Sequence, residues 1–280
     1  MKVISKKKVA SRKVYDLSIQ DNENFMVTKS DIIVHNSGKG FVKEKLMGIE
    51  GWSFDVDEIK RFSIMAKGIR NKVKEKFGKN IADFNLKNPT EVGELHQFIS
   101  TFYNEYGIDD ARKKTMFRAI AASDPRRKPN LIFDVTLKSF SKLKSLSDAL
   151  AELGYDKKDI HLVWVVNDIE IAKKQNAERA RTVPVEILVN THRGVSQTMQ
   201  DVVSMGKDMK KYLDGDVVFA FNKVGVDSSI QKSGKGGSYI DKANYFYVKR
   251  TGQAPMTMDQ IKKDLGAKLS QYVPRNIDWS

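Results

Sequence analysis

Three consecutive side chains, His35-Asn36-Ser37, have the chemistry to cut a polypeptide and to receive one. An asparagine amide can attack its own backbone carbonyl, which closes a five-membered succinimide and breaks the chain after Asn36. The reaction needs a polarised carbonyl and a protonated leaving amine, and the adjacent imidazole of His35 can supply both near neutral pH. The Ser37 hydroxyl can hold an upstream polypeptide as an ester before that break, and such an ester rearranges spontaneously to a peptide bond.

The residues that lead to this triplet have the pattern of a compact β fragment. Residues 14–19 alternate as in a strand, residues 21–24 are typical of a turn, and residues 25–27 begin a second strand. A short apolar run at 32–34 leads directly to His35. Because a fragment of this size buries too little apolar surface to fold alone, we expect it to need a partner.

Residues 1–37 resemble the C-terminal splicing region of inteins, and in particular the short C-terminal fragments of naturally split inteins. The resemblance rests on Val14-Tyr15-Asp16-Leu17, Asn24-Phe25 and Val34-His35-Asn36-Ser37. It implies that residues 1–36 are a small all-β (Hint-type) fragment, which binds an N-terminal intein chain and needs no cofactor. Asn36 would then cyclise, and the partner's polypeptide would be ligated to Ser37. The resemblance also implies that Asp16 assists the acyl transfers at the junction.

One position departs from the intein pattern. Glu23 stands where many family members carry a histidine that assists the final cyclisation. Glu23 either replaces that histidine as a proton carrier or leaves the step slower. Two alternatives remain open: residues 1–36 are an inactive intein remnant, or they are a β-hairpin followed by a deamidation-prone Asn-Ser pair.

The next residues, Ser37-Gly38-Lys39-Gly40, match the end of a phosphate-binding loop. In such a loop, backbone N–H groups cradle phosphates at the start of a helix. We expect a helix from about Phe41, with Lys39 bridging the β- and γ-phosphates of ATP or GTP. The strand and first glycine of the pattern are missing, so they would have to end the partner chain that joins Ser37. Phe41 lacks the hydroxyl that usually helps to hold Mg²⁺, so carboxylates would have to contribute more to metal binding.

From residue 37 to about residue 225 the sequence resembles P-loop kinases of the zeta-toxin and polynucleotide-kinase group. The resemblance rests on the motif order of Phe54-Asp55-Val56-Asp57, residues 131–136 and residues 178–184. It implies transfer of the γ-phosphate of ATP, with Mg²⁺, to a hydroxyl acceptor. The acceptor would be a nucleotide sugar or the end of a polynucleotide.

The resemblance also implies a role for individual side chains. Asp57 would accept the proton of the acceptor hydroxyl, with Asp55 as the alternative, and Asp55 and Asp134 would lie near the metal. Arg179 and Arg181, in a lid over about 175–195, would stabilise charge on the transferring phosphoryl group.

Simpler interpretations of these residues stay open. The two aspartates near residue 56 can cap a helix over 58–70, and Arg179 and Arg181 can be solvated helix charges. The product would then be a protein that binds nucleoside triphosphate or nucleic acid without phosphorylating anything.

The order of elements after residue 37 predicts an α/β domain with a parallel sheet over residues 37–280. Residues 58–123 have a mostly helical pattern, broken near Gly78 and Asn88-Pro89, and are the expected source of acceptor specificity. The expected strands are 52–54, 131–133, 161–166 and 217–221, and the expected later helices are 138–153 and 168–180.

Composition limits the remaining possibilities. The chain has no cysteine, which excludes disulfides, a thiol nucleophile and a thiolate metal site, and fits a reducing cytoplasm. The sequence contains no run of about 18 apolar residues, so it predicts no membrane span.

The net charge of the chain is +14. Residues 1–36 carry seven basic and four acidic groups, a net charge of +3, so +11 belongs to the rest. This balance favours anionic partners, or reflects a lysine-rich solubilising surface.

Overall fold

The computed structural model describes residues 51–55, 67–106, 117–120, 128–178, 182–223, 225–232 and 238–279. Its strands form a two-stranded sheet of order β1-β2 and a four-stranded sheet of order β3-β4-β6-β5. The strands are β1 (Trp52–Asp55), β2 (Leu131–Asp134), β3 (Leu162–Asn167), β4 (Val217–Asn222), β5 (Ser228–Lys232) and β6 (Ser238–Lys249). The protein is therefore of mixed α/β class, with the four expected strands formed by β1 to β4.

The larger sheet is mixed, although a parallel sheet was expected. β3 and β4 pair in parallel, as do β1 and β2, but β6 runs antiparallel to both β4 and β5. The expectation came from the alternation of strands and helices, which ends at β4. After β4 the chain forms a hairpin instead of another crossover helix, and adjacent antiparallel strands need only a short connection.

Helices α5 and α6 lie close to the expected ranges 138–153 and 168–180, whereas α7, α8 and α9 were not among the expected helices. Gly78, with φ of 69°, follows α2 in a left-handed conformation that glycine adopts readily. Pro89 is the first residue of α3. The N–H of the first helical residue makes no hydrogen bond within the helix, so proline, which has no N–H, is tolerated there. The helices are α2 (Lys67–Phe77), α3 (Pro89–Tyr106), α5 (Phe140–Glu152), α6 (Ile169–Glu178), α7 (Val185–Ser204), α8 (Met258–Ile261) and α9 (Ala267–Tyr272), with one π-helical turn, Lys262–Gly266, joining the last two.

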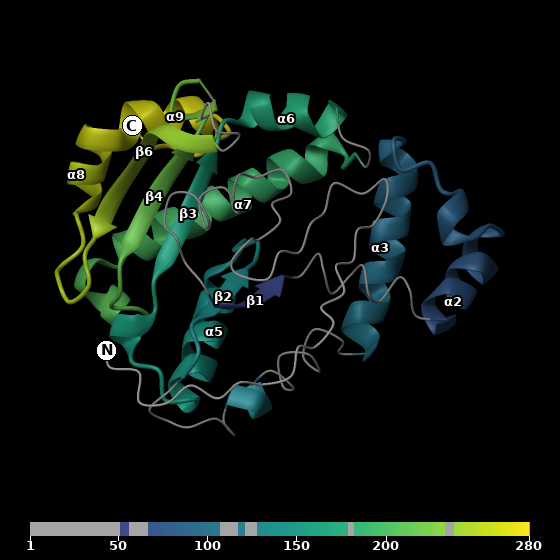
Figure 1. Cartoon of the computed structure of the whole chain (residues 1–280), viewed down its shortest axis with the longest axis horizontal. Helices are drawn as coiled ribbons and strands as arrows, with labels where there is room; N and C mark the ends of the chain where they lie inside the picture. Colours follow the sequence, from purple (N-terminus) through teal and green to yellow (C-terminus); the bar gives the residue numbers. More distant parts are fainter. Residues whose placement is uncertain are drawn as a thin grey trace, which may run out of the picture.

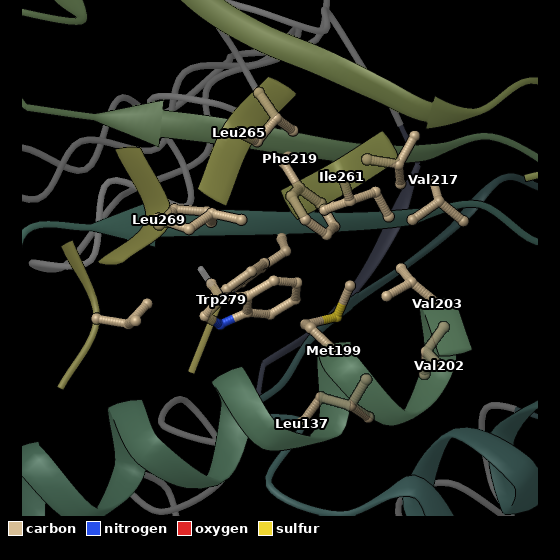
Figure 2. Packing of buried hydrophobic residues seen from close by; sticks show 14 of the residues in the cluster. Leu137, Met199, Val202, Val203, Val217, Phe219, Ile261, Leu265, Leu269 and Trp279 are labelled. Atoms are coloured by element: carbon tan, nitrogen blue, oxygen red, sulfur yellow. The ribbon is translucent and has the colours of Figure 1, made fainter. Parts of the chain in front are cut away.

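The main core joins the larger sheet to helices α5, α7, α8 and α9. All residues from 217 to 221 in β4 are about 1 % exposed or less, and the Phe219 ring packs edge-on against Trp164 of β3. Figure 2 shows Trp279 between Met199 of α7 and Phe219 of β4. The Trp279 indole N–H donates to Ser196 Oγ over 2.7 Å, so its polar atom is satisfied inside the core. The last residues of the described chain thus complete this core.

A second, smaller cluster forms where α2 and α3 approach β1. Phe54 of β1, Val73 of α2 and Ile99 of α3 are all buried in it. Figure 1 shows α2 and α3 standing to one side of the larger sheet. Phe133 of β2 packs against both clusters, so β2 connects the two cores. Among the described residues, no helix is long and apolar enough to cross a membrane.

Candidate functional site

The carboxyl ends of the parallel strands carry polar residues at matching positions. Asp55 and Asp134, the last residues of β1 and β2, are register partners, and so are Asn167 and Asn222, the last residues of β3 and β4. In open α/β sheets, ligands bind outside the carboxyl ends of the strands. This edge is therefore the candidate site of the described chain.

The two parallel pairs point in the same direction. Ahead of β2 and β3, the Tyr155 hydroxyl donates to the Pro129 carbonyl oxygen over 2.7 Å. Beyond their carboxyl ends, α7 passes close to the segment that follows β2. A Cβ atom built onto Gly194 of α7 would lie 3.5 Å from the Cβ atom of Lys138. One turn of α7 thus contacts the segment after β2, and His192 of the same turn feels the charge of Asp168, directly after β3. The carboxyl ends of β1, β2, β3 and β4 therefore lie at one side of the molecule.

Three groups hold the carboxylate of Asp168 at this edge. Its Oδ1 accepts from the backbone N–H groups of Glu170 and Ile171, so it caps the start of α6. Its Oδ2 lies 2.8 Å from Lys223 Nζ, at the end of β4. Burial alone would raise the pKa of Asp168, but these hydrogen bonds and the Lys223 charge outweigh burial and hold the pKa below its usual value.

Asn167 places an amide at the same edge. It is 4 % exposed, and within the described residues its Oδ1 has no hydrogen-bond partner. A buried carbonyl-type oxygen without a donor costs free energy, and ligand-binding positions are one place where this occurs. Asn167 Oδ1 is thus a buried acceptor without a donor among the described residues, at the candidate edge of the sheet.

His192 contributes a neutral side chain beside Asp168. Burial lowers the pKa of His192, and the negative charge of Asp168 partly opposes that shift. An imidazole with a lowered pKa is uncharged near neutral pH, so it can donate or accept a hydrogen bond without competing with Lys223 for the carboxylate.

The segment that joins α6 to α7 is anchored to the turn at Leu86 and Lys87, between α2 and α3. The Asn176 side chain bonds both the N–H and the carbonyl oxygen of Val183, at 2.9 and 2.7 Å. The Thr182 N–H donates to the Leu86 carbonyl oxygen over 2.9 Å, and its hydroxyl donates to the Lys87 carbonyl oxygen over 3.1 Å. The base of the predicted lid is therefore fixed against the region expected to select the acceptor.

Most of the predicted site residues lie outside the described residues. The structure gives Asp134 and the backbone of Asp55, and it brings these two together as register partners. Within the described ranges, no three His, Asp or Glu side chains gather in a way that would hold a metal ion. The predicted residues outside the described ranges are Asp16, His35, Asn36, Ser37, Gly38, Lys39, Gly40, Asp57, Arg179 and Arg181.

Sequence reasoning missed Asp168, Lys223 and His192 as a group. Asp168 and Lys223 each follow a predicted strand by one residue, which is a usable signal for the carboxyl edge of a sheet. His192 stands in the middle of a helix and carries no such signal. Its proximity to Asp168 arises only from the packing of α7.

The chain was compared with protein-family models, curated proteins and solved structures, and none of them matches it.

Proposed function

We propose that this chain is the C-terminal half of a protein trans-splicing pair whose ligated product is a P-loop kinase. Residues 1–36 bind an N-terminal split-intein chain, and Asn36 cyclises after the partner polypeptide has passed to Ser37. The joined loop, with Lys39, then binds ATP or GTP with Mg²⁺. The product transfers the γ-phosphate to a hydroxyl of a nucleotide sugar or of a polynucleotide end.

One observation carries the proposal: His35-Asn36-Ser37 stands directly before Gly38-Lys39-Gly40. The junction falls at the point where the missing strand and glycine of a phosphate loop would have to attach. Ser37 therefore ends one motif and begins the other, and the unspliced chain has no complete phosphate loop. We expect the unspliced chain to be inactive as a kinase.

The carboxyl edge of the sheet supports the second half of the proposal. Four parallel strands end there, with Asp134, Asn167, Asp168 and Lys223 at or next to the strand ends. A phosphate loop after a further parallel strand would open onto the same edge. Acidic, amide and cationic groups at one edge suit a nucleotide, a metal ion and an acceptor hydroxyl.

Splicing is tested by mixing the full chain with a chain that carries a matching N-terminal split-intein fragment. Mass spectrometry should find two products, a fragment ending at Asn36 and a partner polypeptide joined to residues 37–280. Failure to release that fragment, beside a control pair that splices, would count against the proposal. Release without ligation would show self-cleavage instead of splicing.

Phosphotransfer is tested on the spliced product, with a partner polypeptide that ends in a strand and a Gly-rich turn. Labelled ATP is offered with a nucleotide sugar or with an oligonucleotide that has a free terminal hydroxyl. Asp57→Asn should remove most of the transfer, whereas Asp159→Asn, at an exposed position between α5 and β3, should not. An Asp57→Asn product that transfers phosphate at full rate would exclude Asp57 as the base. A product that binds ATP without transfer to any acceptor would favour a binding protein.

A further inference from the structure

Helix α2 carries a concentrated positive charge. Its 11 residues include five basic side chains and one acidic side chain, which gives a net charge of +4. Helix α3, which packs against α2 through the smaller core, has no lysine or arginine. The positive charge of this helix pair is therefore confined to α2.

Three of these cations share one face of α2. Lys67, Arg70 and Lys74 stand at positions i, i+3 and i+7, which lie above one another along a helix. All three are exposed, whereas Ile69 and Val73, on another face, are buried in the smaller core. Figure 1 shows α2 on the side of α3 that is away from the larger sheet. We call Lys67, Arg70 and Lys74 the α2 cation row.

The cations that face α3 already have partners in the protein. Lys72 Nζ lies 4.7 Å from the centre of the Phe102 ring of α3. Lys79 follows α2, and its Nζ lies 2.5 Å from Oε2 of Glu91 of α3. The side chains of the α2 cation row, in contrast, make no hydrogen bond or ion pair with any described residue. The row is thus not used to hold α2 in place.

The α2 cation row is unfavourable for the helix itself. Arg70 and Lys74 are four residues apart, and like charges at this spacing repel each other. Residues 67–74 contain no acidic side chain that would offset the repulsion. A surface that serves only solubility usually intersperses charges of both signs. A bound polyanion would remove the repulsion and turn the row into a favourable feature.

We propose that the α2 cation row binds the phosphate backbone of a polynucleotide strand. Seven residues of helix rise about 10 Å, and one strand carries a phosphate about every 3.4 Å along its axis. The row therefore covers about three successive phosphates. It lies on α2 and not at the carboxyl edge of the strands, so this binding requires neither splicing nor phosphotransfer.

Two other anionic partners fit the α2 cation row less well. A helix that lies on a membrane carries large apolar side chains next to its cations, but the exposed residues of α2 are lysine, arginine, glycine, asparagine and glutamate. Protein interfaces are rich in aromatic side chains and poor in lysine. A phosphate backbone needs only the positive charges and their spacing.

Fluorescence anisotropy of the full chain with a labelled single-stranded oligonucleotide of about 16 nucleotides tests the proposal. At about 50 mM salt, the triple variant Lys67→Gln, Arg70→Gln, Lys74→Gln should bind about tenfold more weakly than wild type. Its plot of log association constant against log salt concentration should be less steep by about 2, because each phosphate contact on a single strand contributes about 0.7. Glutamine forms helix about as well as lysine, so thermal denaturation should show no loss of stability.

The matched control replaces three exposed lysines on other elements, Lys144→Gln, Lys207→Gln and Lys210→Gln. Both triple variants lose three positive charges, so both keep a net charge of +11, from +14 less 3. The control should bind within about twofold of wild type, because it leaves the row intact.

A second variant separates charge from helix structure. Lys67→Arg, Arg70→Lys and Lys74→Arg exchange the side chains but keep all three charges, so this variant should bind as wild type does. Weak binding by this variant would overturn the proposal, because charge would then not be the cause.

Four further results would overturn the proposal. One is absence of binding by wild type at about 50 mM salt, and another is equal binding by wild type and the glutamine variant. A third is an equal loss in the matched control, which would make net charge alone responsible. The fourth is a glutamine variant that keeps oligonucleotide binding but loses binding to phosphatidylserine vesicles, which would assign the row to a membrane surface.

This inference and the proposed function fail separately. If the glutamine variant loses the oligonucleotide but mixing with the intein partner releases no fragment, the α2 cation row stands and splicing fails. If the spliced product transfers phosphate and all variants bind the oligonucleotide equally, the kinase stands and the row fails.

Discussion

Asp168 and Lys223 meet across the carboxyl ends of β3 and β4, with the lysine Nζ 2.8 Å from the carboxylate Oδ2. The carboxylate is almost buried, whereas the lysine is about one third exposed, with side-chain exposures of 8 % and 34 %. The same carboxylate caps α6 through its other oxygen. One side chain thus fixes the start of a helix and the relative position of two strands at the proposed nucleotide-binding edge.

Replacement of Asp168 by asparagine should destabilise the fold by about 1–3 kcal/mol at pH 7, because asparagine keeps the cap but loses the charged pair. The pKa of Asp168 is lowered in the folded chain, so its stabilising effect is present above the unfolded pKa, about 3.9. The effect should disappear as pH falls through the folded pKa, so wild type and variant should converge. Urea denaturation at a series of pH values measures this.

The control for Asp168→Asn is Asp156→Asn. Asp156 also precedes a helical turn, but its side chain makes no capping hydrogen bond. Its replacement should change the free energy of unfolding by about 0.5 kcal/mol or less. A gap between wild type and Asp168→Asn that stays constant down to pH 2 would contradict the assigned role of the charge.

Lys249, at the end of β6, is a buried cation with a complete set of partners. Its side chain is 1 % exposed, it pairs with Asp214 at 2.8 Å, and it donates to the carbonyl oxygens of Asp214, Gly215 and Arg250. Lys249→Met should cost about 3–5 kcal/mol, because it leaves these acceptors buried without a donor. Lys262→Met is the comparison, because Lys262 Nζ lies 3.8 Å from Asp278 Oδ2 and both side chains are exposed to solvent. It should cost less than about 1 kcal/mol, and equal losses in thermal denaturation would exclude a special role for Lys249.

Trp279 should be among the most important side chains for stability, although it stands next to the end of the chain. It is fully buried, its ring centroid lies 5.6 Å from that of Trp164, and it bonds Ser196. Trp279→Ala should cost about 3–5 kcal/mol. Trp52→Ala, at a residue that is 48 % exposed, should cost about 0.5 kcal/mol or less. Chemical denaturation of both variants tests this, and a stable Trp279→Ala chain would show that the C-terminal segment is not part of the core.

Asn36→Ala should abolish release of residues 1–36 when the chain is mixed with a matching N-terminal intein fragment. Alanine has no side-chain amide to attack the backbone carbonyl, so no succinimide can form. Asn22→Ala is the matched control, because it removes an amide from the predicted turn at 21–24 without touching the junction. Mass spectrometry of the two mixtures should show the fragment only for the control. Release from Asn36→Ala would mean that another reaction breaks the chain.

Local sequence patterns predicted strands β1 to β4 and helices α5 and α6, but not α7, α8 or α9. The apolar run at Leu162–Asn167 and the terminal Asp134 of β2 formed as expected. Helix α5 begins and ends within two residues of the expected 138–153. These elements were predictable because period, strand length and flanking turn residues act over a few neighbours.

The β5–β6 hairpin was not predicted, because apolar and polar residues do not alternate regularly along its two strands. The exposure of Trp52 and the burial of Trp279 were not predicted either, since each depends on which other segments pack against the residue. A large apolar ring favours burial, but the chain must still supply a surface that covers it.

What the sequence by itself determined is the local chemistry: the His35-Asn36-Ser37 triplet, the adjoining Gly38-Lys39-Gly40 and the strands that end in polar residues. The tertiary structure alone decided that Lys223 pairs with Asp168, that His192 lies near enough to feel the charge of Asp168, and that β2 connects the two cores. The physical reason is range. Reactivity and backbone preference depend on adjacent residues, whereas side-chain meetings and strand order depend on the packing of segments that are far apart in the chain.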